Sequence, residues 1–120
     1  MNLLERVVAN LDMEAGTAER GIGAMLVALR MSVPPADFER IKDAVPTTER
    51  MMGRALMSGG RTGEMAAPIG PAGLLAALGA AGVLKEDIPR LARIVVEYLR
   101  PTVPGAVLDT FLDAHPALKQ

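Results

Sequence analysis

The chain has 120 residues, half of them apolar, and a formal net charge of −1. That length suits a single domain with one core, and the near-neutral charge argues against a protein that binds nucleic acid by neutralising phosphates. The absence of cysteine excludes disulfides and thiol chemistry. With no Trp, one Tyr and two Phe, the core must be built from aliphatic side chains and methionine. Because Ala, Leu and Met favour helices, we predict an all-α fold, a compact bundle of about six or seven helices.

Apolar residues recur at helical spacing along the first half, between breaks made by proline and glycine. Thr17 is the predicted N-cap of the second helix, and the Pro34–Pro35 pair fits the start of the third. The predicted helices of this half are 2–11, 18–31, a segment from Pro35 to Val45, and 48–57.

A Gly- and Pro-rich stretch at residues 58–71, SGGRTGEMAAPIGP, predicts a linker between the two halves. In the second half Asp87 is the predicted cap of a long helix, and a proline opens the last one. The predicted helices there are 72–82, 87–100 and a segment that begins at Pro104.

The sequence also resembles itself at a period of 70 residues. Segment 29–46, LRMSVPPADFERIKDAVP, aligns without gaps with segment 99–116, LRPTVPGAVLDTFLDAHP, and eight of the 18 columns are identical. Over 3–46 and 73–116 the identities number 10 of 44. Such self-similarity indicates a structural unit used twice. We predict two related three-helix copies within the single domain 1–120, the first about 1–57 and the second about 72–120, packed face to face.

Two long patterns carry a family resemblance: AERGIGAMLVALRMSVPPADFERIKDAVP and, after the linker, LKEDIPRLARIVVEYLRPTVPGAVLDTFL. In them the chain resembles the VcgC/VcgE-like bacterial family of unknown function, over about residues 10–112. The resemblance implies a Gly/Ala-rich helix, a short helix that ends at a Val-Pro turn, and a second long helix after a Gly-rich middle. It implies no activity and no site residue.

Candidate catalytic or metal-binding residues are few. His115 is the only histidine, and no cysteine or second histidine could complete a site, so we interpret it as a residue of a helix C-terminus. The charges kept in both copies, Arg30/Arg100 and Asp43/Asp113, could contact anions, but fixing the helix ends is the favoured interpretation. We therefore expect no enzyme, no bound metal and no cofactor.

Methionines gather where the two copies differ, in helix 48–57 and the linker. Methionine fills gaps in cores, which is the favoured interpretation of these residues, and it also lines adaptable binding surfaces, which is the functional hypothesis. We predict a non-enzymatic interaction module that binds a protein partner or a second copy of itself as a homodimer. The alternative is a binder of a small apolar ligand in an aliphatic pocket between the copies. The predicted surface consists of Met51, Met52, Leu56, Met57 and Met65.

A long uncharged stretch, residues 65–84, raises the question of a membrane span. Pro68, Gly70 and Pro71 interrupt it, and the remaining helix is too short to cross a bilayer. The N-terminal residues carry charges within their apolar stretch, unlike a signal peptide. We expect no membrane span and a cytoplasmic location.

Overall fold

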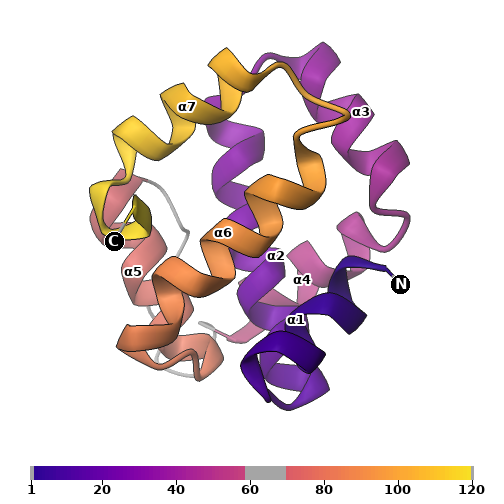
Figure 1. Cartoon of the computed structure of the whole chain (residues 1–120). Helices are drawn as coiled ribbons and strands as arrows, with labels where there is room; N and C mark the ends of the chain where they lie inside the picture. The colour runs from indigo at the N-terminus through magenta and orange to yellow at the C-terminus, as the bar shows by residue number, and fades with distance from the viewer. Residues whose placement is uncertain (1, 59–69, 120) are drawn as a thin grey trace.

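The computed structural model describes residues 2–58 and 70–119, and for residues 56–58 and 70–72 it describes the backbone alone. Within these ranges the chain is all-α, which confirms the predicted fold class. The described residues form seven α-helices and two 3-10 segments. Figure 1 shows the helices packed into one body. In chain order they are α1 (Leu3–Leu11), α2 (Ala15–Ser32), α3 (Pro35–Ala44), α4 (Thr48–Ser58), α5 (Gly70–Ala81), η2 (Lys85–Asp87), α6 (Ile88–Leu99), α7 (Gly105–Ala114) and η3 (Pro116–Lys119).

The N-termini of the first two helices are set in different ways. Asn2 and Glu5 form a capping box at α1, since the Asn2 side chain accepts from the Glu5 N–H at 2.8 Å and the Glu5 carboxylate accepts from the Asn2 N–H. At α2 the predicted cap is wrong. The N-cap is Glu14, and the Ala18 N–H already donates to its carbonyl at 2.9 Å, so Thr17 lies inside the first turn.

Chain breakers set the ends of several other helices. Prolines occupy the N-cap positions of α3 and α7, as their predicted roles at the helix starts require. α5 ends at Ala81, and Gly82 after it has a left-handed φ of +94°; the Val83 N–H donates back to the Leu78 carbonyl at 3.0 Å. Asp87 stands at the N-cap of α6, but its side chain makes no capping bond and contacts Arg90 at 3.5 Å instead.

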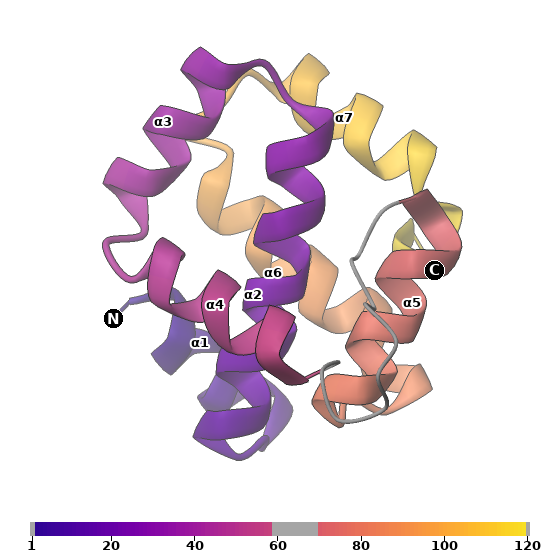
Figure 2. The same cartoon turned by 180° about the vertical axis from the view of Figure 1, so that it is seen from behind.

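Two helices form the centre of the molecule, α2 and α6. Figure 2, a half-turn from Figure 1, shows α2 in front of α6, whereas Figure 1 shows α6 in front. α4 and α5 pack against α2, and α1 and η3 pack against α6. Every residue from 21 to 29 of α2 is buried, because α2 is enclosed by other helices on all sides.

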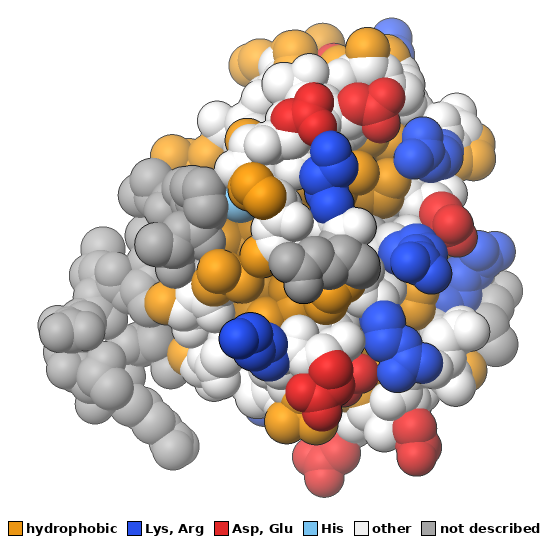
Figure 3. Space-filling model, turned by 60° about the vertical axis from the view of Figure 1, so that its left-hand side comes forward, with side chains coloured by type: hydrophobic (Ala, Val, Ile, Leu, Met, Phe, Trp, Pro, Cys, Tyr) orange, Lys and Arg blue, Asp and Glu red, His pale blue; other side chains and the backbone are white. Residues whose placement is uncertain are grey.

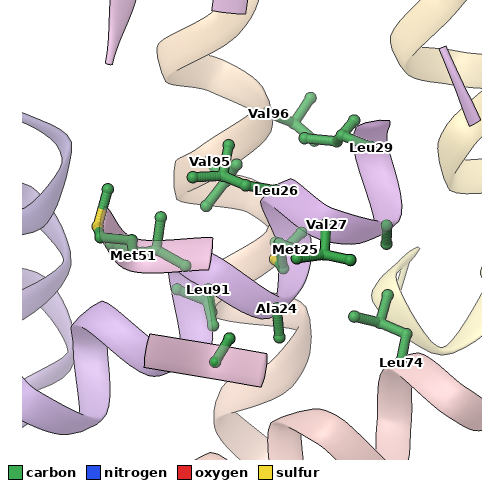
Figure 4. Close-up of a cluster of buried hydrophobic side chains, with 14 of the residues drawn as sticks. Ala24, Met25, Leu26, Val27, Leu29, Met51, Leu74, Leu91, Val95 and Val96 are labelled. Atoms are coloured by element: carbon green, nitrogen blue, oxygen red, sulfur yellow. The ribbon is translucent and has the colours of Figure 1, made fainter. Parts of the chain in front are cut away.

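The core between these helices is a continuous cluster of aliphatic side chains. Figure 4 shows Leu26 of α2 beside Val95 of α6, and both side chains have no exposed area. Met25, in the same turn of α2, is also fully buried. The core is therefore aliphatic with methionine, as the composition predicts.

Several helix ends recur at the 70-residue offset. α3 and α7 cover residues 35–44 and 105–114, and α1 and α5 end at residues 11 and 81. Each of the latter two is followed by a left-handed residue, Asp12 or Gly82. The neighbours correspond only in part: α1 packs on α6 and α5 packs on α2, but α1 also packs on α2. The duplication itself stays a prediction, because matching boundaries and neighbours do not establish that the halves superpose.

Among the described helices, none combines the length and the hydropathy needed to cross a membrane.

Candidate functional site

The structure divides the predicted methionine surface into described and undescribed parts. Met51 and Met52 lie in the core, 1% and 5% exposed. The side chains of Leu56 and Met57, and all of Met65, lie outside the described residues. Core filling is thus the role of Met51, while Met52 also reaches an open groove at the surface.

α4 lies very close to α2, and Gly23 is the reason. A Cβ built on Gly23 would stand 1.9 Å from the carbonyl oxygen of Met51, so only glycine lets the two backbones meet there. One turn earlier on α2, the Glu19 carboxylate pairs with Arg54 at 2.9 Å and Arg50 at 4.0 Å, both from α4. These contacts fix α4 against the N-terminal half of α2.

An open groove results where α2, α3 and α4 meet, with a volume of about 550 Å³. Phe38 and Met52 supply its apolar floor, and both side chains are more than nine-tenths buried. Gly53 forms one wall without a side chain, and the space beside it is open, because a Cβ built there would meet nothing within 4 Å. We call this the Met52 groove; its residues are Arg30, Phe38, Glu39, Lys42, Glu49, Met52 and Gly53.

Charges of both signs border the Met52 groove. The Lys42 Nζ lies 2.9 Å from a Glu49 oxygen and 3.9 Å from a Glu39 oxygen, which links α3 to the start of α4. The hydrogen bond from Lys42, and then its charge, lower the pKa of the Glu49 carboxyl. The hydrogen bond to Glu49, together with the charges of Glu39 and Glu49, raises the pKa of Lys42.

The Lys42–Glu49 pair predicts a weak pH dependence of stability. The pKa of Glu49 is lowered on folding, so the ionised carboxylate stabilises the folded state. This stabilisation is complete above the ordinary carboxyl pKa and is lost as the pH falls through the lowered pKa. Replacing Lys42 with Met should return the Glu49 pKa toward its ordinary value. An NMR titration of the Glu49 carboxyl in both proteins measures this, and identical titration curves would contradict the pairing. The effect on global stability should be small because the pair is exposed.

Sequence reasoning missed most of this groove. Phe38 and Lys42 join Met52 there only because α3 folds back beside α4, whereas Glu49 lies on α4 itself, one turn before Met52. Arg30 was the available signal, since it is one of the charges that recur at the 70-residue offset. It borders the groove and forms no ion pair with any residue that the structure describes. Within residues 2–58 and 70–119, neither Arg30 nor Arg100 forms an ion pair with Asp43 or Asp113.

His115 occupies the predicted position at a helix C-terminus. It is the C-cap residue of α7, 5% exposed, and its Nδ1–H donates to the Phe111 carbonyl at 2.9 Å. Its ring lies 4.7 Å from the Phe111 ring, centroid to centroid. Across the described part of the chain, no group of three or more His, Asp or Glu side chains has a geometry suited to a metal ion. His115 thus satisfies a helix-end carbonyl and packs in the core.

Comparison with protein-family models, curated proteins and solved structures finds no match for this chain. The VcgC/VcgE-like resemblance therefore stays a prediction, and the Met52 groove is the basis for a functional proposal.

Proposed function

We propose that this protein is a non-enzymatic helical interaction module that binds a segment of a protein partner in the Met52 groove. The observation that carries the proposal is the groove itself: an open volume of about 550 Å³ with an apolar floor and a charged border. Phe38 and Met52 offer a seat for a large apolar side chain of the partner. This is also the region of helix 48–57, where the sequence predicts a binding surface.

The border of the groove favours a peptide segment over an apolar small molecule. Arg30 and Lys42 face Glu39 and Glu49 around an opening to solvent, so groups of both signs are available to a polar backbone and its side chains. An apolar ligand would leave these charges without new partners. The alternative pocket between the two copies has less support, because side chains such as Leu26 and Val95 fill the space where α2 and α6 meet.

The proposal assigns no catalytic role to the groove. Its carboxylates Glu39 and Glu49 contact Lys42 at an exposed border, where a lowered pKa makes Glu49 a weaker base.

Replacing Gly53 with Gln should block the groove without harming the fold. Nothing lies within 4 Å of the built Cβ of Gly53, and Gln is a better helix former than Gly by about 0.5–1 kcal/mol. Gly79→Gln is the matched control, because Gly79 is an exposed residue of α5 with equally open surroundings. Affinity capture with quantitative mass spectrometry should recover a protein with the wild type and the Gly79 variant, and several-fold less of it with the Gly53 variant.

The captured protein must then bind the purified chain directly, with the same sensitivity to Gly53→Gln in calorimetry. Equal binding by all three proteins would overturn the proposal. Light scattering identifies self-association: a dimer that Gly53→Gln dissociates would make the occupant a second copy. If only lipophilic compounds raised the melting temperature, and Gly53→Gln abolished the shift, the apolar-ligand alternative would replace the proposal.

A further inference from the structure

A second open groove lies along α6 and is independent of the Met52 groove. It is bounded by α6, α7 and η3 and has a volume of about 280 Å³. Its floor is apolar, since Ala92, Val96 and Leu118 are buried there. We call it the α6 groove; its lining residues are Pro89, Ala92, Arg93, Val96, Glu97, Arg100, Leu112, Leu118 and Lys119.

The border of the α6 groove is basic, although the whole chain has a net charge of −1. Three basic residues line it, Arg93, Arg100 and Lys119, against one acidic residue, Glu97. Lys119 pairs with Asp113 at 2.8 Å, whereas the two arginines form no ion pair within the described ranges. Both arginine side chains are exposed. Figure 3 looks onto the side of the molecule that carries α5 and the C-terminal segment, where apolar side chains lie between charged ones.

The first half of the chain shows a helix packed on a central helix, and it offers a comparison for the α6 groove. There α4 lies on α2 at Glu19 and Gly23. The residues 70 positions later are Pro89 and Arg93, and both border the α6 groove. Under the predicted 70-residue correspondence, this face of α6 matches the face of α2 that α4 covers. Here η3 contributes Leu118 and Lys119 to the lining of an open groove.

We propose that the α6 groove binds an amphipathic helix of a protein partner that carries acidic side chains. Its apolar face would cover Ala92, Val96 and Leu118, and its carboxylates would pair with Arg93 and Arg100. Because an arginine stands where α2 has Gly23, this helix lies farther from α6 than α4 does from α2. Helix α4 of a second copy is a poor occupant, since it would bring Arg50 and Arg54 toward a basic border.

Two designed helical peptides test this proposal. Both carry the same leucine stripe, with Glu on the flanks of one and Lys on the flanks of the other, and binding is measured by fluorescence anisotropy at low salt. The acidic peptide should bind about tenfold more tightly than the basic one. The double variant Arg93→Glu/Arg100→Glu should remove that difference. Arg40→Glu/Lys85→Glu changes the net charge by the same amount at exposed sites outside both grooves, and should retain it.

The remaining outcomes decide the proposal in either direction. Equal binding of both peptides, or an equal loss in both double variants, would overturn it. A single-stranded DNA oligonucleotide that bound as tightly as the acidic peptide, with the same dependence on Arg93 and Arg100, would also overturn it, because the groove would then recognise charge alone. If the charge-reversed variant fails to fold, Arg93→Gln/Arg100→Gln replaces it, and it should reduce the preference for the acidic peptide by a smaller amount. Gly53→Gln should leave peptide binding unchanged, so failure at one groove is separable from failure at the other.

Discussion

Replacing Gly23 with alanine is expected to destabilise the protein by about 3 kcal/mol or more, the upper part of the range for overpacking. The new Cβ would stand 1.9 Å from the Met51 oxygen and 2.5 Å from the Met51 carbonyl carbon. Both atoms belong to the backbone of α4, so no side-chain rotation relieves the overlap and α4 has to move away from α2. Equilibrium denaturation in urea, followed by far-UV circular dichroism, measures the loss.

Gly21→Ala is the matched control in the same helix. Its built Cβ meets side-chain atoms only, of Val83 at 3.0 Å and Leu91 at 3.1 Å, which can shift by small amounts. We expect a loss of about 1 kcal/mol or less, because the gain in helix propensity offsets part of the crowding. If the two variants lost equal stability, Gly23 would not be the point of close approach between α2 and α4.

Replacing Met51 with alanine should cost about 2–5 kcal/mol, the usual range for removing a fully buried large side chain. Met51 is 1% exposed and belongs to the common core, so its removal leaves a cavity between α4 and the rest of the core. Thermal and urea unfolding both report the change.

Met31→Ala provides the comparison for an exposed methionine. Met31 is 60% exposed near the end of α2, and its replacement should change stability by no more than about 0.5 kcal/mol. If both variants lost only a small and similar free energy of unfolding, Met51 would not be a core residue and would belong to the predicted binding surface.

Most of the secondary structure could be predicted because its signals are local. The prolines before α3 and α7 and the spacing of apolar residues lie within a few positions of the helices that they define. The cap of α2 could not be predicted in this way. Thr17 has the right chemistry for an N-cap, but the residues before it also adopt the helical conformation and bring the helix start forward to Ala15.

The Met52 groove was only partly predictable. Helical spacing indicates that Met51 and Met52 belong to an amphipathic helix, but not which partner covers each side chain. The answer depends on Gly23, whose role appears only when α4 lies against it, and on α3, which brings Phe38 and Lys42 to the same opening. These contacts join residues of three different helices, and no pattern within one helix encodes them.

The sequence by itself determined the all-α class, the positions of the helices and the aliphatic, methionine-containing core, because composition, periodicity and proline breaks act over one or two turns. The tertiary structure alone decided that residues 21–29 of α2 are all buried, that Met51 fills the core, and that two grooves with different charges stay open. The physical reason is that burial and charge pairing depend on which helices meet in space. A helical stripe shows that a face is apolar, and only packing determines whether another helix covers it.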